Sequence, residues 1–138
     1  MLHIDGTARR TVAAPPARCL QVLADVDAYP SWSSLITAVE RLDGGRLRLR
    51  AHALGLAVAM TCVLDVSAET AVLRRVTHGP DDGERFEAAF TVTPVGGGST
   101  VELHTVADVE APGPAALLKG RVKKALVDDL LADFASAV

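Results

Sequence analysis

The chain has 138 residues, of which 49% are apolar and 22% are charged, and its formal net charge is −3. This length predicts a single domain spanning residues 1–138, and this composition excludes a disordered chain. The acidic balance and the few aromatic residues (three Phe, one Tyr and one Trp) argue against a nucleic-acid binder, which needs a basic excess and stacking surfaces.

Breaks rich in Gly and Pro divide the chain into segments whose apolar residues follow the period of a strand or a helix. A first strand at residues 3–14 ends at Pro15-Pro16. Two short helices follow at residues 17–25 and 27–32. Alternating or β-branched residues then predict six further strands, at residues 35–42, 46–51, 56–66, 71–78, 84–94 and 99–110.

The last segment, residues 114–138, carries the strongest helical pattern. Leu118, Val122, Leu126, Leu130 and Phe134 recur every four residues, with charged residues between them. Such a helix has one apolar face to bury, and the sheet is the only partner available. The predicted fold class is therefore α+β. A curved seven-stranded antiparallel sheet wraps around a long C-terminal helix, and two short helices lie between strands one and two.

The two cysteines predict neither a disulfide framework nor a zinc site. Cys19 and Cys62 form no CxxC pair, and we expect two buried, reduced thiols. The amino terminus lacks the pattern of a signal peptide. The longest stretch without Asp, Glu, Lys or Arg, residues 51–64, is too short to span a bilayer. We therefore expect a cytoplasmic protein without stable membrane insertion.

Three stretches carry a resemblance to a known family. They are residues 12–16, residues 23–32 with the element Tyr29-Pro30-Ser31-Trp32, and residues 117–131, where a basic run precedes an apolar stripe. Together they resemble the START-like helix-grip superfamily (SRPBCC), specifically its bacterial polyketide cyclase/dehydrase and lipid transport branch. The resemblance covers residues 6–136. It implies a deep apolar cavity between sheet and helix that accepts lipids, polyketides or similar small molecules. Because the branch includes both carriers and enzymes, the activity stays open.

Catalytic and metal-binding motifs are absent from the sequence. There is no GxSxG, no HExxH and no phosphate-binding glycine loop, since no helix follows the triple glycine at residues 96–98. His52 and His78 lie on strands that are not neighbours, and their alternation predicts that both face solvent. A β-bulge would reverse that orientation. No metal and no cofactor is predicted.

Two polar side chains are predicted to face the concave side of the sheet. With Leu73 directed inward, Arg75 is directed inward too, and its guanidinium would suit a carboxylate or enolate of a ligand. Alternatively, it reaches the sheet edge or pairs with Asp65 or Glu87. Thr105 is the second such side chain, and its hydroxyl is expected to bond to the local backbone.

Small and aromatic residues bear on the shape of the interior. Tyr29 and Trp32 either plug one end of the fold or line the entrance for a ligand. Inward alanines on the strands leave space unless the helix approaches the sheet closely. That close approach is predicted at Gly120. Otherwise, Gly120 marks a bend at which the start of the helix acts as a lid.

Two clusters of basic residues complete the pattern. Arg46, Arg48 and Arg50 alternate along one strand, and we expect a solvated convex face. Residues 119–124 carry four cations, of which Lys124 is expected to pair with Asp128. The others would attract an acidic ligand or an anionic membrane surface.

We therefore expect a non-catalytic binding or carrier protein for a hydrophobic small molecule, acidic or not, present as a monomer or homodimer. A cyclase needs a general base, and no inward carboxylate or histidine is predicted. The alternative is an aromatase, cyclase or dehydratase with Arg75 as oxyanion partner and Tyr29 or Thr105 handling protons. A third alternative is a partner-binding module. The predicted ligand-binding residues are Tyr29, Trp32, Leu49, Met60, Leu64, Arg75, Phe86, Phe90, Leu103, Thr105, Leu118, Val122 and Leu126.

Overall fold

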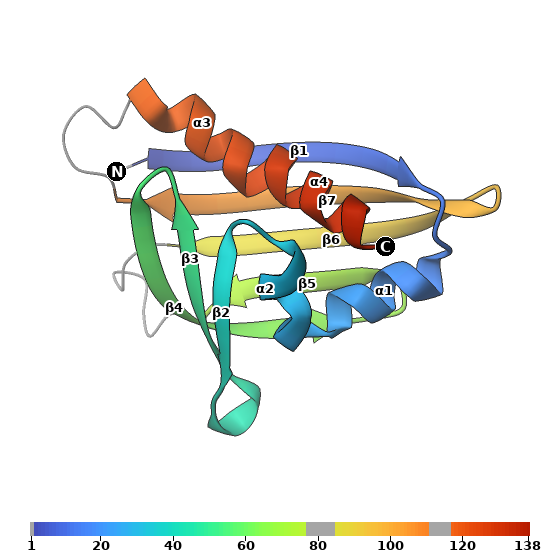
Figure 1. The fold of residues 1–138 in the computed structure, drawn as a ribbon, viewed down its shortest axis with the longest axis horizontal. Helices are drawn as coiled ribbons and strands as arrows, with labels where there is room; N and C mark the ends of the chain where they lie inside the picture. The colour runs from blue at the N-terminus through green and yellow to red at the C-terminus, as the bar shows by residue number, and fades with distance from the viewer. Residues whose placement is uncertain (1, 77–84, 111–116) are drawn as a thin grey trace.

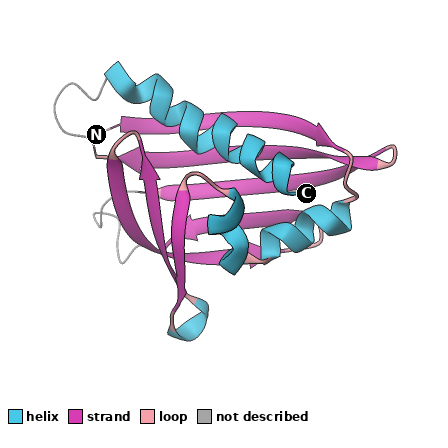
Figure 2. Ribbon diagram, in the orientation of Figure 1, coloured by secondary structure: helices cyan, strands magenta, loops and turns pink. Residues whose placement is uncertain are grey.

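A computed structural model describes residues 2–76, 85–110 and 117–138. It contains a seven-stranded sheet in the order β1-β7-β6-β5-β4-β3-β2, with every neighbouring pair antiparallel. Strands β2 to β7 form a meander, and β1 closes the sheet beside β7. The helices lie against one face of this curved sheet (Figures 1 and 2). The α+β helix-grip fold predicted from the sequence is confirmed.

The bounds of the elements follow the predicted pattern closely. The strands are β1 (Leu2–Val12), β2 (Ile36–Arg41), β3 (Leu47–Ala53), β4 (Leu56–Val66), β5 (Thr70–Arg75), β6 (Phe86–Val95) and β7 (Gly98–Val109). The helices are α1 (Pro16–Ala24), α2 (Tyr29–Trp32), α3 (Lys119–Lys124) and α4 (Leu130–Ala137), with single turns η1 (Val26–Ala28) and η2 (Asp43–Gly45). The predicted ends at residues 77–78, 84 and 114–116 lie outside the described residues.

The C-terminal helix changes its winding in the middle. A π-helical segment, η4 (Ala125–Asp129), joins α3 to α4. Along the described residues the helix runs from Lys119 to Ala137 across β1 and β7 (Figure 1). None of the helices in the described ranges is long and apolar enough to cross a membrane.

Alternate residues of the central strands face the helix and form the core. On β6 these are Phe86, Ala88, Phe90 and Val92, and on β7 they are Val101, Leu103, Thr105 and Ala107, all buried. The side chains between them lie on the opposite face, which no described helix covers. This period of two is the reason that the sequence pattern predicts the burial so well.

The helix packs closely on the sheet at Gly6 of β1, and not at Gly120. A Cβ atom at Gly6 would lie 2.7 Å from Lys123 Cε and 3.0 Å from Val127 Cγ2. At Gly120 a Cβ would meet nothing within 4 Å. The prediction of close packing at Gly120 is therefore wrong, because that residue lies on the exposed side of α3. The change in winding falls at η4, five residues further on.

Candidate functional site

A pocket lies between the sheet and the first half of the C-terminal helix, with a cavity volume of about 70 Å³. It occupies the end of the sheet where β3, β5 and β7 finish and β4 and β6 begin. Its walls are mostly aliphatic. The lining residues are Leu35, Ile36, Leu49, Ala51, His52, Ala53, Leu56, Val58, Met60, Leu73, Arg75, Arg85, Phe86, Ala107, Asp108, Val109, Val122 and Leu126.

The cavity is smaller than the deep one that the family resemblance implies. Pockets that enclose a drug-sized molecule have volumes of about 300–1,000 Å³. A cavity of about 70 Å³ has room for one ring or a short alkyl segment, so the rest of a larger ligand would extend through the opening.

About half of the predicted ligand-binding residues lie on the pocket lining. These are Leu49, Met60, Arg75, Phe86, Val122 and Leu126. The remaining ones lie elsewhere in the structure: Tyr29, Trp32, Leu64, Phe90, Leu103, Thr105 and Leu118. Four of these, Leu64, Phe90, Leu103 and Thr105, lie on the concave face of the sheet but further along the strands, away from the pocket.

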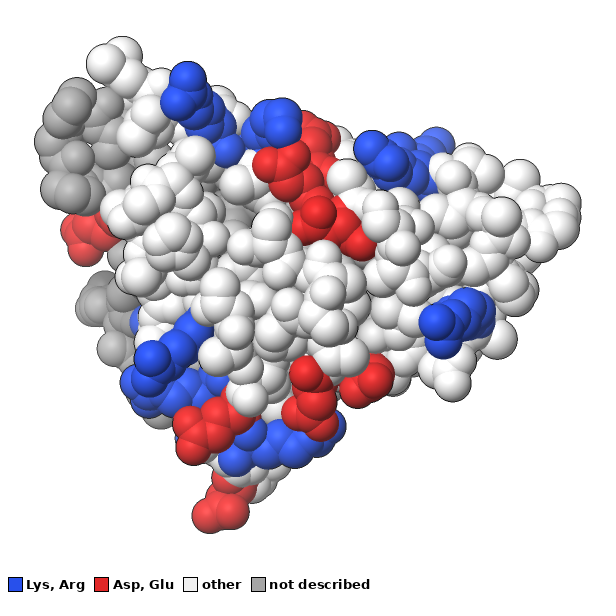
Figure 3. Space-filling model, in the orientation of Figure 1, with Lys and Arg blue, Asp and Glu red and all other residues white. Residues whose placement is uncertain are grey.

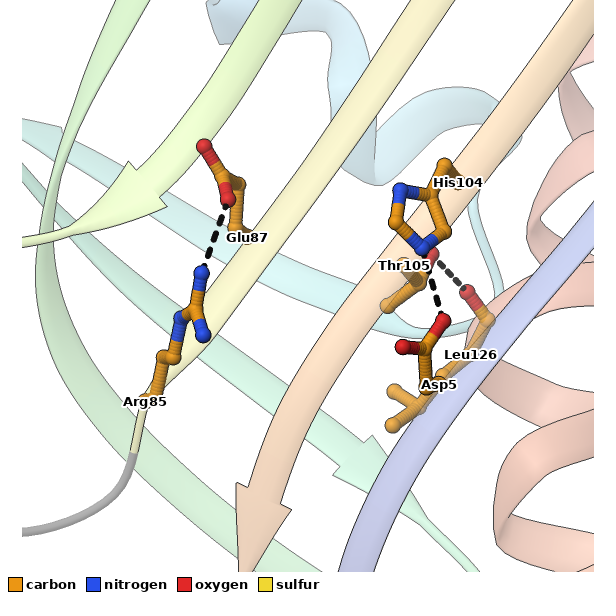
Figure 4. Close-up of polar contacts among 6 residues, drawn as sticks. All are labelled: Asp5, Arg85, Glu87, His104, Thr105 and Leu126. Carbon is orange, nitrogen blue, oxygen red and sulfur yellow. Dashed lines mark hydrogen bonds and ion pairs between the residues drawn. The ribbon is translucent and has the colours of Figure 1, made fainter.

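The polar lining residues lie at the ends of the strands. Leu73 is buried and Arg75 lies on the lining, as the alternation along β5 predicts. One alternative was that Arg75 pairs with Asp65. Instead, Asp65 pairs with the outward neighbour Arg74, whose Nη2 donates to Asp65 Oδ2 at 2.8 Å. Arg85 also lies on the lining, with Nη2 at 3.5 Å from Glu87 Oε2 (Figure 4).

Two further titratable groups at this end were not predicted. His52 is exposed, as expected, yet it also lies on the pocket lining, and Asp108 lies on the lining while it pairs with His3. The alternation of β3 and β7 nevertheless places both side chains on the outer face, His52 with Arg50 and Asp108 with its partner His3. Both residues border the pocket at the ends of their strands. His78 lies outside the described residues.

Cys62 lies on the concave face, opposite Arg75 in the ladder between β4 and β5. Its side chain is fully buried, and burial raises the pKa of its thiol to about 12, with the charge of Arg75 acting in the opposite direction. The thiol therefore stays protonated at neutral pH, and Cys62 acts as an apolar core residue rather than a nucleophile.

Tyr29 and Trp32 belong to an aromatic cluster away from the pocket. The ring centroids of Tyr29 and Trp32 are 5.0 Å apart, those of Trp32 and Phe134 are 5.8 Å apart, and those of Phe90 and Phe134 are 5.5 Å apart. The hydroxyl of Tyr29 donates to the carbonyl oxygen of Leu23, and burial raises its pKa. Of the two interpretations, the structure favours the one in which these residues plug one end of the fold.

Thr105 is fully buried, and its hydroxyl Oγ1 donates to the carbonyl oxygen of Leu126 at 2.9 Å (Figure 4). The expected backbone partner is thus present, but it comes from the helix rather than from the local backbone. This hydroxyl lies outside the pocket lining. Of the three residues named for an enzyme, only Arg75 lies on that lining.

Charged side chains of the described residues are spread over the surface. Within residues 2–76, 85–110 and 117–138, no group of three His, Cys, Asp or Glu side chains could hold a metal ion. His104 pairs with Asp5 at 2.7 Å on the outer face (Figure 4). Lys124 pairs with Asp129 at 2.6 Å and not with Asp128, because the π-helical winding shifts the register by one residue. Figure 3 shows the intermingled acidic and basic side chains on the helix side.

Residues 3–138 match the family model described as "Polyketide cyclase / dehydrase and lipid transport". No curated protein matches the chain. Among solved structures, the protein TTHA0849 from Thermus thermophilus is similar with a TM-score of 0.76 and 22% identity, over 96% of this chain and 94% of that one. A START superfamily protein from Mycobacterium smegmatis has a TM-score of 0.74 and 20% identity, over 100% and 97%.

An aromatase/cyclase named Zhui, from Streptomyces sp. R1128, is similar to the same degree. Its TM-score is 0.74 at 21% identity, over 98% of this chain and 93% of that one. At these identities the solved structures show a shared fold.

Proposed function

The chain belongs to the polyketide cyclase/dehydrase and lipid transport family, and from this membership we propose that it binds and carries a hydrophobic small molecule, lipid or polyketide-like. The proposed site is the pocket between the sheet and the C-terminal helix. The observation that carries the proposal is the aliphatic lining of that pocket, with polar groups gathered at the strand ends. Such a lining favours an apolar ligand through burial of apolar surface.

The size and charge of the pocket narrow the class of ligand. Since the cavity volume is about 70 Å³, we propose that one ring or alkyl end inserts among Leu49, Met60 and Val122, while the polar end stays at the opening. Two arginines, Arg75 and Arg85, are among the lining residues. A planar guanidinium binds a carboxylate through two parallel hydrogen bonds, which supports an acidic polar end.

Binding of dodecanoate and of dodecanol, measured by titration calorimetry, tests this proposal. Val58→Phe on β4 would fill the pocket and is expected to weaken dodecanoate binding at least tenfold. Val66→Phe is the matched control, because Val66 lies on the same strand but is exposed and away from the lining. Equal affinity of the Val58→Phe and Val66→Phe variants would mean that dodecanoate binds outside this pocket.

Native mass spectrometry of the purified protein, with extraction of any bound molecule, would identify the natural ligand.

The acidic part of the proposal has its own test. Arg75→Gln is expected to weaken dodecanoate binding while leaving dodecanol binding within twofold, because the guanidinium charge attracts a carboxylate but not a hydroxyl. Equal loss for both ligands would mean that Arg75 contributes to folding or packing rather than to recognition of an acid.

A second candidate function is cyclisation or dehydration of a polyketide-like substrate. The observation that favours it is the presence of His52 and Asp108 on the pocket lining, since an enzyme of this kind needs a general base. An aromatase/cyclase among the similar structures supports the same idea. We expect His52→Ala to abolish turnover of a synthetic β-ketone substrate without loss of binding. Absence of turnover by the unaltered protein would leave only the carrier function.

A further inference from the structure

The outer face of the sheet carries a row of arginines on β3. Arg46, directly before the strand, and Arg48 and Arg50 within it are all exposed, while Leu47 and Leu49 between them are buried. Since a strand rises about 3.3 Å per residue, alternate side chains are about 6.6 Å apart, and the row extends over roughly 13 Å.

This arginine row has no carboxylate partner within the described residues. Elsewhere on the surface, Arg9, Arg41, Arg74 and Arg85 each have a carboxylate oxygen within 3.5 Å. Glu40 stands opposite Arg48 in the ladder between β2 and β3, yet forms no ion pair with it. The three guanidinium groups of the row are therefore available to carboxylates of another molecule.

Small side chains lie beside the row on the neighbouring strand. On β4, Ala59 stands opposite Arg50 and Thr61 stands opposite Arg48. Ala57 and the half-buried Val63 extend this strip of small outward side chains. The helices of the described chain lie on the other face of the sheet (Figure 1), so the strip is open to a partner.

We propose that the arginine row and the adjoining strip on β4 bind an amphipathic acidic α-helix of a partner protein. Carboxylates four residues apart on a helix are about 6 Å apart along its axis, which is close to the spacing of the arginines. A helix with such an acidic edge would place its apolar edge over Ala57, Ala59 and Val63. Arginine is enriched at protein interfaces and binds carboxylates in a bidentate manner.

The position of the row would bring such a partner close to the pocket. Arg50 lies between Leu49 and Ala51, and both of these residues lie on the pocket lining. The partner would therefore sit on the opposite side of the same stretch of β3. Its binding does not depend on which ligand the pocket takes.

A stapled helical peptide tests this interface. The peptide carries three Glu residues spaced four apart beside a row of Leu, and its control carries Gln in place of Glu. Fluorescence anisotropy at low and high salt gives the affinity. Replacing all three arginines (Arg46→Gln, Arg48→Gln, Arg50→Gln) is expected to weaken binding of the Glu peptide at least tenfold, or about 1.4 kcal/mol. The control variant removes the same charge from α3 (Lys119→Gln, Arg121→Gln, Lys123→Gln) and is expected to keep the affinity within twofold.

Amide chemical-shift changes on β3 and β4 upon addition of the peptide would support the interface, and thermal melts establish that both triple variants fold. Unchanged affinity in the arginine variant, or shift changes confined to α3, would overturn the proposal. Tighter binding of duplex DNA or of phosphatidylserine vesicles through the same arginines would overturn it as well, because the partner would then not be an acidic helix.

Discussion

The hydroxyl of Thr105 donates a hydrogen bond of 2.9 Å to the carbonyl oxygen of Leu126, which lies inside the π-helical segment η4. Thr105 is fully buried on β7, so this bond ties that strand to the point where the helix changes its winding. A π-helical turn pairs backbone groups five residues apart in place of four, and the carbonyl oxygen of Leu126 accepts this side-chain bond within it. Leu126 also lines the pocket, so the bond fixes one pocket wall.

Thr105→Val should destabilise the protein by about 1–3 kcal/mol, because it keeps the shape of the side chain but leaves a buried carbonyl without its donor. Urea denaturation gives the free energy of unfolding. Thr105→Ser is the control, since it keeps the hydroxyl, and it should lose less. A valine variant as stable as the unaltered protein would show that Leu126 finds another donor.

Gly6→Ala should also destabilise the protein, by about 1–3 kcal/mol. The new Cβ would lie 3.0 Å from Val127 Cγ2, and Lys123 would have to move its side chain away as well. The matched control is Gly97→Ala, where a Cβ meets nothing within 4 Å. If both variants melt at the same temperature, the helix can shift away from β1 without cost.

Gly120→Ala should stabilise the protein by up to about 1 kcal/mol, since glycine is a poor helix former and the position is open to solvent. Thermal unfolding followed by circular dichroism measures the change. A lower melting temperature would instead mean that Gly120 supplies a bend that α3 needs.

Much of the fold was predictable because burial follows the period of each element. The alternation from Leu56 to Val66 predicts the bounds of β4 as they are observed. The π-helical turn was not predictable from the four-residue spacing of the apolar residues. Residues four apart lie on the same side of the helix in an α-helix and in a π-helix alike. The contact of Gly6 with Lys123 and Val127 joins distant parts of the chain, and no local pattern encodes it.

The candidate site was predictable only in part, for a related reason. Alternation along a strand predicts which face of the sheet a side chain lies on. It does not predict which part of that face borders the pocket. Phe86 and Phe90 share the concave face of β6, yet only Phe86 lies on the pocket lining. His52 and Asp108 border the pocket at strand ends, although the alternation places their side chains on the outer face.

The aromatic cluster should act independently of the pocket. Phe134→Leu is expected to cost about 1–2 kcal/mol of stability, through the lost contacts with Trp32 and Phe90. Because Trp32 is the single tryptophan, its fluorescence reports the change directly. The affinity for dodecanoate should stay within twofold. A large loss of affinity would connect this end of the core to the ligand site.

The buried thiol of Cys62 should make stability fall in alkaline solution. Burial raises its pKa to about 12, whereas in the unfolded chain the thiol titrates near its ordinary value of about 8.5. Between these values the unfolded chain has lost a proton that the folded chain keeps, so the free energy of unfolding decreases as the pH rises. Tyr29, whose pKa burial also raises, adds to the same trend.

Urea denaturation at several pH values between about 8 and 11 would measure this slope. Cys62→Ala should unfold more easily at every pH, but its free energy of unfolding should fall less steeply above about pH 9, because one of the groups responsible is gone. Leu64→Ala is the matched control, since it removes apolar volume from the concave face of the same strand without removing a titratable group. Its slope should equal that of the unaltered protein. If the Cys62→Ala slope were equally steep, the alkaline loss of stability would have to come from Tyr29 or from other groups.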